Sequence, residues 1–145
     1  MHPFHHAASS ARQHGGEPED YLPIHHWFDE SKQGMPDSRH RAMRHHAEGI
    51  FWCEQIFGVT VKNSDGKEIP TRVIGEQHVK EDLGRIPTLA DWLREMRLCK
   101  WMSNSPKAFR ESLEEVNAYL EFRKDKLKEA EIDILPALKD GDSCG

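Results

Sequence analysis

Apolar residues at helical spacing, in runs bounded by proline and glycine, constrain the fold of this chain more than any other feature of its sequence. The clearest run predicts a long helix over 105–129, introduced by Asn104, Ser105 and Pro106, which are typical of a helix start. Its apolar positions recur at helical spacing, at Phe109, Leu113, Val116, Leu120 and Leu127. Because such a stripe packs on something, this helix is the predicted surface for a homo-oligomer or a protein partner.

Shorter helical segments are predicted in the first hundred residues, each between residues that start or stop helices. The longest covers 37–57, with an N-cap at Asp37 and a stop at Gly58. Gly49 lies inside this segment and predicts close packing against another backbone. The other segments cover 4–14, about three turns from Pro23 to before Gly34, then 75–83 and 88–96.

A small β-hairpin is predicted over about 59–74, because β-branched runs flank the turn residues 63–66. Pro70 places its second strand at an edge. We therefore expect a mainly α fold, a compact helical domain of four to six helices with one hairpin and a long C-terminal helix. Residues 1–104 are expected to form the domain, and 105–145 an appended helix with a loose tail from Leu135.

Composition bounds the class of protein. A hydrophobic share of 37% and a charged share of 31% are typical of a globular domain, and 145 residues suit one core. No apolar run is long enough to span a membrane and no secretory signal is evident, so we expect a cytoplasmic protein without a membrane partner. A net charge of -5 gives no reason to expect nucleic acid as a partner. The three cysteines are widely spaced and are expected to be reduced thiols, with Cys53 buried.

All ten histidines lie within the first 78 residues, and three of them have a pattern that points to a metal site. On helices, His25 and Asp29 would share one face, as would His78 and Asp82. His46 lies on the apolar arc of the segment 37–57 and is expected to point inward. Imidazole and carboxylate are ligands of Zn, Fe and Mn. The predicted ligands are His25, Asp29, His46 and His78.

Two functions follow from this pattern, and the sequence leaves both open. In the first, the metal activates water for hydrolysis, with Glu76 or Asp82 as the catalytic base. In the second, the histidines are structural and the protein is a non-enzymatic interaction or oligomerisation protein. The metal motifs HExxH, ExxH and CxxC are absent from the sequence. The metal site is therefore inferred from separate histidines and carboxylates, without a recognised motif.

A basic segment offers a third function. Arg39, Arg41 and Arg44 lie close together in sequence at the start of 37–57, and a helix N-terminus favours anions. They are candidate residues for a weak anion or RNA binder. Asp37 and Glu48 lie nearby, however, and a solvated basic turn needs no ligand.

Several polar strings of the chain resemble an uncharacterised bacterial and phage family, a domain of unknown function. The resemblance covers residues 1 to about 102 and leaves the long C-terminal helix outside. It implies no activity, but His25, Asp29, His46, His78 and Asp82 all lie within its motifs. These motifs are DYLPIH at 20–25, WFDESK at 27–32, RHRA at 39–42, HHAEGI at 45–50 and GEQHVKEDLG at 75–84.

Overall fold

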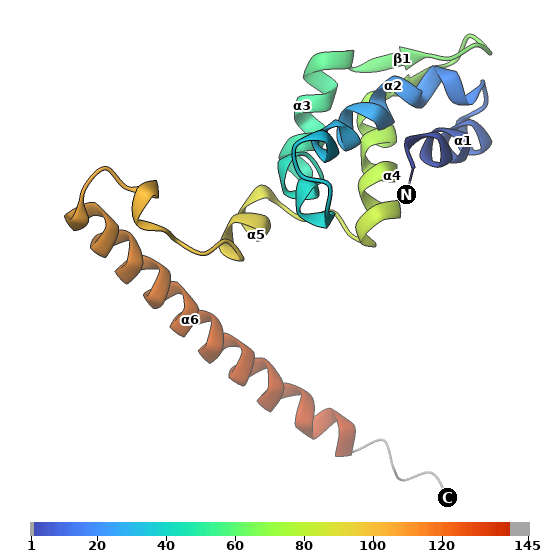
Figure 1. Cartoon of the computed structure of the whole chain (residues 1–145). Helices are drawn as coiled ribbons and strands as arrows, with labels where there is room; N and C mark the ends of the chain where they lie inside the picture. The colour runs from blue at the N-terminus through green and yellow to red at the C-terminus, as the bar shows by residue number, and fades with distance from the viewer. Residues whose placement is uncertain (1, 140–145) are drawn as a thin grey trace, which may run out of the picture. The chain divides into compact units, whose positions relative to one another are not determined.

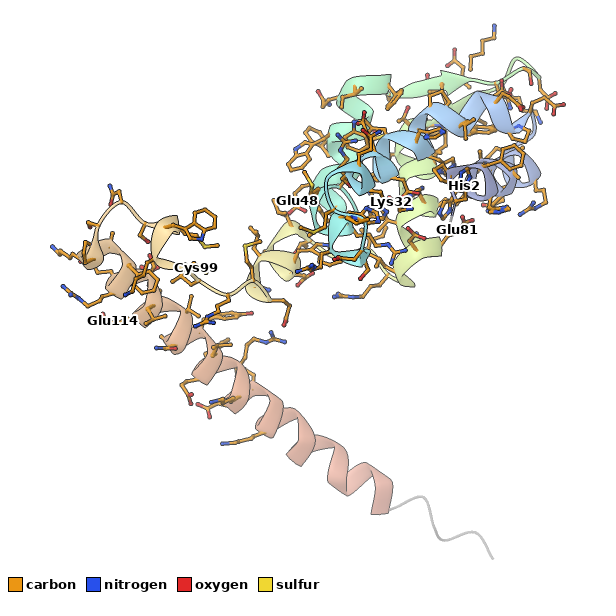
Figure 2. The ribbon with its side chains drawn as sticks, viewed as in Figure 1. His2, Lys32, Glu48, Glu81, Cys99 and Glu114 are labelled. Atoms are coloured by element: carbon orange, nitrogen blue, oxygen red, sulfur yellow. The ribbon has the colours of Figure 1, made fainter. Side chains whose placement is uncertain are left out.

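The computed structural model describes residues 2–139 of the chain, with side chains up to residue 126 and at residue 128. It confirms a mainly helical fold with one small antiparallel hairpin and a long C-terminal helix (Figure 1). The chain divides into two compact units, residues 1–96 and 97–145. Side chains fill the space between the helices of the first unit, whereas those of α6 in the second project outward (Figure 2).

The first unit holds five α-helices, two 3₁₀ helices and the hairpin among its described residues. In chain order they are α1 (Pro3–His14), α2 (Pro18–Asp29), η1 (Glu30–Gln33), η2 (Ser38–Met43), α3 (Ala47–Phe57), β1 (Thr60–Lys62), β2 (Glu68–Pro70), α4 (Thr71–Leu83) and α5 (Leu89–Arg94). The second unit holds η3 (Lys100–Met102) and α6 (Pro106–Lys139).

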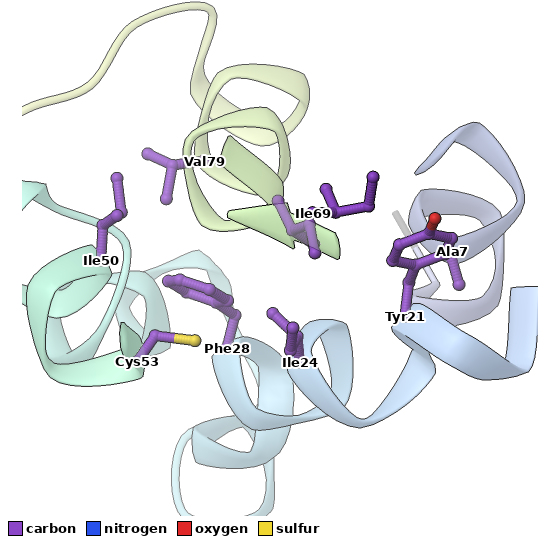
Figure 3. Packing of buried hydrophobic residues seen from close by; sticks show 9 residues of the cluster. Ala7, Tyr21, Ile24, Phe28, Ile50, Cys53, Ile69 and Val79 are labelled. Carbon is purple, nitrogen blue, oxygen red and sulfur yellow. The ribbon is translucent and has the colours of Figure 1, made fainter. Parts of the chain in front are cut away.

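A small hydrophobic cluster joins α1, α2, α3, α4 and β2 (Figure 3). Phe28 of α2 is fully buried, close to Ile50 and Cys53 of α3 in the close-up. Gly75 lets α4 approach this cluster, because a Cβ there would stand 3.2 Å from both the Phe28 ring and the Ile50 side chain. Because α4 lies close to α2 at this point, the polar residues that follow one turn later on α4 are also held near α2. Burial also raises the pKa of the Cys53 thiol to about 12, so that this cysteine is inert.

The hairpin pairs Val61 with Ile69 at its centre and is attached to the rest of the unit through its turn. Asn63 is buried and donates from Nδ2 to the hydroxyl of Tyr21, at 3.1 Å. Ser64 donates from both its backbone N–H and its hydroxyl to Asp20. The hairpin predicted at 59–74 is confirmed, except that α4 already begins at Thr71, immediately after Pro70.

Two helix predictions in the first half are wrong. Helix α2 begins at Pro18 and contains Pro23, because Glu17 and Asp20 form a capping box five residues earlier than the sequence analysis placed the start. The predicted single helix over 37–57 is two elements, η2 and α3, separated by residues 44–46. Gly49 permits the break, since any Cβ at this position would overlap the backbone carbonyl of Arg44. The predicted close packing of Gly49 against another backbone is thereby confirmed.

The remaining helix predictions are largely confirmed. The helix at 4–14 is α1, and Thr88 and Asp91 form the capping box that starts α5. Helix α6 runs to Lys139 and so includes the first residues of the tail that was expected to be loose; the loose tail stays a prediction, and residues 140–145 lie outside the described part of the chain. None of the described helices combines the length and apolar character needed to cross a bilayer.

Candidate metal centre

Helix α4 brings the first two members of the site together. His78 and Asp82 lie one turn apart on its buried face, and their side chains are 0% and 2% exposed. The Nε2 of His78 is 3.9 Å from Oδ2 of Asp82. A histidine and an aspartate four residues apart on a helix can therefore present their donor atoms to one ion, as the sequence analysis expected.

Helix α2 contributes Asp29 at its C-terminal end. Its Oδ1 lies 3.7 Å from Nε2 of His45 and 3.9 Å from Nε2 of His78, and accepts no hydrogen bond from the described residues. The other oxygen, Oδ2, forms an ion pair at 2.8 Å with Lys32, one turn further along the chain. A carboxylate at a helix C-terminus is disfavoured by the helix dipole, and Lys32 offsets this cost.

His45 lies in the link between η2 and α3, and backbone contacts hold it there. Its N–H donates to the carbonyl of Arg41 at 2.7 Å, and its carbonyl accepts from Nε1 of Trp92 at 3.1 Å. The adjacent Arg44 carbonyl packs against Gly49, where only glycine fits. The imidazole is fully buried, with Nε2 directed at Oδ2 of Asp82 at 3.2 Å.

Four donor atoms thus meet in a buried cluster, which we name the His/Asp cluster. They are Asp29 Oδ1, His45 Nε2, His78 Nε2 and Asp82 Oδ2. The two imidazole nitrogens are 3.1 Å apart, and donor atoms of the four residues lie within 4.8 Å of one another. The side chains are at most 3% exposed. Two imidazoles and two carboxylates at this spacing could hold a metal ion.

Burial sets the charge state of the histidines in and behind the His/Asp cluster. It lowers the pKa of His78, and the neighbouring His6 and His45 lower it further. Burial likewise lowers the pKa of His25 to about 3. The pKa of His45 is lowered by burial, an effect that Asp82 only partly opposes. These rings are therefore neutral at neutral pH, which is the form that binds metals.

Charged groups also surround the carboxylate of Asp82. Burial alone would raise its pKa, but hydrogen bonds from His45 and His6 and the charge of Arg41 hold it well below the usual range. His6 Nε2 is 3.5 Å from Oδ1 of Asp82, and His6 Nδ1 is 2.6 Å from Glu81. Burial opposes protonation of His6, but these two carboxylates outweigh it and raise its pKa. Figure 2 labels Glu81 and Lys32, the partially exposed partners at this end of the unit.

The structure brings together some of the predicted ligands and not others. Asp29 and His78 lie in the His/Asp cluster, and His25 lies behind His78 with its Nδ1 3.0 Å from Nδ1 of that residue. His46 does point inward, but it caps α3 by accepting from the N–H of Gly49 at 2.9 Å, away from the cluster. Its place is taken by His45, which the sequence analysis left without a role.

The other predicted site residues are also placed. Asp82, expected as a base, is one of the four donors, whereas Glu76 is paired with Arg72 and Lys80 on the outer face of α4. Each of the three candidate anion-binding arginines contacts a carboxylate of its own chain: Arg39 contacts Asp37, Arg41 contacts Asp82 and Arg44 contacts Glu30.

Fold and site together define a small helical domain with a buried cluster of histidines and aspartates. The chain belongs to the family described as Domain of unknown function (DUF6915), whose model matches residues 1–102. This range contains the whole His/Asp cluster and ends before α6. No curated protein and no solved structure matches the chain.

Proposed function

We propose that this chain is a metal-binding protein whose His/Asp cluster holds one divalent transition-metal ion. The spacing of the donor atoms carries the proposal, because five of the six separations among them are 3.1–3.9 Å. Four donors that are each about 2.1 Å from an ion stand about 3.4 Å apart in tetrahedral geometry. The cluster therefore has the dimensions of a four-ligand site.

The unsatisfied oxygen of Asp29 supports the same proposal. Buried polar atoms in native proteins almost always have a hydrogen-bond partner, and an ion is one explanation for those that have none. Oδ1 of Asp29 is buried, lies 3.7 and 3.9 Å from the Nε2 atoms of His45 and His78, and accepts no hydrogen bond from the described residues. A cation at the centre of the cluster would satisfy it.

The donor set favours Zn²⁺, Fe²⁺ or Mn²⁺. Imidazole suits Zn and Fe, while carboxylate extends the set to Mn, and Ca²⁺ and Mg²⁺ prefer oxygen ligands alone. At equal availability the Irving–Williams order places Zn²⁺ above Fe²⁺ and Mn²⁺. Zinc is therefore the ion that we propose first, and iron and manganese are its competitors.

The closed surroundings favour a structural ion over a catalytic one. Structural zinc sites have four protein ligands, whereas catalytic sites keep a position open for water. All four side chains here are at most 3% exposed. Metal-dependent hydrolysis stays a prediction, and it would require a cluster ligand to give way to water while Glu76, already paired with Arg72, acted as the base.

Elemental analysis tests the proposal. The full chain, purified without chelator, is expected to carry close to one transition-metal ion per molecule. Asp29→Asn is expected to lose most of that metal, because it replaces a charged ligand by a neutral one. The matched control is His26→Gln, an exposed histidine on the same helix, which is expected to keep the metal. Metal-free protein that also fails to take up added Zn²⁺ would refute the proposal.

A second candidate function rests on the apolar stripe of α6. Leu113, Val116 and Leu120 are 39%, 41% and 44% exposed, which is unusual for residues repeated along one helix face. As a surface for a second copy of the chain, this stripe would produce a dimer by light scattering. Leu113→Glu combined with Leu120→Glu is expected to convert that dimer to a monomer, and a monomeric unsubstituted chain would exclude this interface.

A further inference from the structure

We infer that His25 is a positioning residue for the metal site, because its hydrogen bond to His78 fixes which ring nitrogen of His78 faces the ion. The inference rests on the proposed metal site. It follows from a buried chain of hydrogen bonds that runs from Gln77 of α4 through Ser10 of α1 and His25 of α2 to His78. Each link fixes the direction of the next.

The first link is the amide of Gln77. One end of this amide is 2.9 Å from Oε1 of Glu81 and 3.4 Å from the carbonyl of His6. Both of these groups only accept hydrogen bonds, so that this end must be the NH₂ group. The opposite end, which faces Ser10 at 2.8 Å, is therefore the oxygen Oε1.

The second link is the hydroxyl of Ser10. Its single hydrogen has two acceptors within reach, Oε1 of Gln77 at 2.8 Å and the carbonyl of His6 at 3.3 Å. Neither acceptor can donate in return, so the hydroxyl proton is used there. The remaining contact, 2.8 Å to Nε2 of His25, requires the histidine to donate and Ser10 to accept.

The third link passes from His25 to His78. Both rings are fully buried, which disfavours the charged form, so each carries one N–H. Because the proton of His25 is on Nε2, its Nδ1 is an acceptor, and the Nδ1 of His78 at 3.0 Å must donate to it. The Nε2 of His78 then carries no proton, and its lone pair is directed into the His/Asp cluster, where a metal would bind.

His45 provides a contrast within the same cluster. Its Nδ1 is buried and has no hydrogen-bond partner among the described residues, so no outer contact fixes its tautomer. Without metal, its Nε2 can donate to Asp82 at 3.2 Å and to the lone pair of His78 at 3.1 Å. The surroundings of His78 thus fix the tautomer that binds a metal through Nε2, whereas no outer contact fixes the tautomer of His45.

Such outer partners contribute measurably to metal sites. A ligating histidine generally donates its second N–H to a carboxylate, carbonyl or water, which orients the ring, and loss of that partner costs about 10–100-fold in metal affinity. Here the partner is another histidine, held in turn by Ser10. We expect the loss of His25 to fall in the same range.

The tautomers can be measured directly in the metal-free protein. In long-range ¹H–¹⁵N correlation spectra of the chelator-treated full chain, the proton of His78 is expected on Nδ1, and the protons of His25 and His45 on Nε2. A proton on Nε2 of His78 would overturn the inference. This measurement needs no bound ion and therefore separates the two claims. If His78 carries Nδ1–H but Zn²⁺ does not bind, the proposed function fails, and with it the role of His25 at a metal site, while the hydrogen bond from His78 to His25 stands.

Zn²⁺ titration of substituted proteins tests the consequence for affinity. His25→Leu removes the acceptor and is expected to weaken Zn²⁺ binding by about 10–100-fold. His25→Asn keeps an oxygen near the position of Nδ1 and is expected to restore most of the affinity. A purely structural role predicts instead that both variants lose stability and keep the Zn²⁺ affinity of the unsubstituted chain, which would also overturn the inference. If His25→Leu does not fold, the tautomer of His78 in the unsubstituted protein decides alone.

Discussion

The interior of the first unit and the surface of α6 use polar and apolar residues in opposite ways. Among the described residues, twelve of the buried ones are polar and nine are hydrophobic, and all of them lie in the first unit. Along α6 the apolar side chains Leu113, Val116 and Leu120 are instead 39–44% exposed. The interior of the first unit is thus made largely of polar groups, whereas α6 leaves its apolar side chains partly exposed.

The polar interior of the first unit bears on the stability of that unit. Six of the buried polar residues are histidines: His6, His25, His40, His45, His46 and His78. Burial of a polar group costs free energy unless it is hydrogen-bonded, and a small unit has little hydrophobic area to offset that cost. A metal ion bound by the folded chain would supply the missing stabilisation, since its binding free energy adds to that of folding.

The largest effect is expected at Gly49, where the link that carries His45 packs against α3. Gly49→Ala should lower the free energy of unfolding by about 3 kcal/mol, because the added Cβ overlaps the Arg44 carbonyl. Gly84→Ala is the matched control: its φ of +72° is strained for alanine, but nothing lies within 4 Å, so a loss of about 1 kcal/mol is expected. Denaturant unfolding measures both, and equal losses would contradict the account of the link.

Addition of metal should stabilise the first unit almost as strongly. Zn²⁺ at about 100 times its dissociation constant raises the free energy of unfolding by about 2.7 kcal/mol when one ion binds only the folded state. Thermal unfolding of the chelator-treated chain, with and without Zn²⁺, measures this difference. His78→Gln should abolish most of the shift, whereas the exposed His26→Gln should keep it.

Acid should destabilise the metal-free first unit. The pKa of His25 is lowered from 6.5 to about 3, so the unfolded chain binds more protons between these pH values. Its contribution to stability is complete above about pH 6.5 and is lost as the pH falls toward 3, with a loss of about 1 kcal/mol between pH 7 and 5.5. His78 acts in the same direction, while His6, whose pKa is raised, opposes it. Denaturant unfolding of chelator-treated His25→Asn should show a weaker pH dependence, and an unchanged dependence would contradict this assignment.

The smallest effect is expected on α6. Leu113 is 39% exposed, and Leu113→Glu should change the unfolding free energy of the first unit by less than about 0.5 kcal/mol. Its Zn²⁺ affinity should also be unchanged. Thermal unfolding and Zn²⁺ titration measure the two properties. A marked loss of either would show that the first unit depends on the surface of α6, contrary to this prediction.

Local signals predicted much of the fold. The capping box of Thr88 and Asp91 and the apolar repeat of α6 depend on residues close in sequence, and both elements form where they were expected. The segment 37–57 fails as one helix because its break depends on distant contacts, such as the Ala47 N–H with the Pro87 carbonyl at 2.8 Å. Gly49 was the only local sign of that break.

The same break explains which site residues were missed. On one continuous helix His46 would face the core, but after the break His46 caps α3 and His45 turns to Asp82. Asp29, His78 and Asp82 could be predicted as site residues because residues four apart lie on one face of a helix, and the segments that contain them are helical. No rule of spacing could place His25 behind His78, since that relation depends on how α2 packs against α4.

Anomalous X-ray diffraction from crystals grown with Zn²⁺ is the decisive measurement for the metal site, because it locates the ion. The account predicts one strong peak inside the His/Asp cluster, at about 2.0–2.2 Å from Asp29, His45, His78 and Asp82. Zinc found only at surface histidines such as His5 or His26, with the cluster empty, would contradict it.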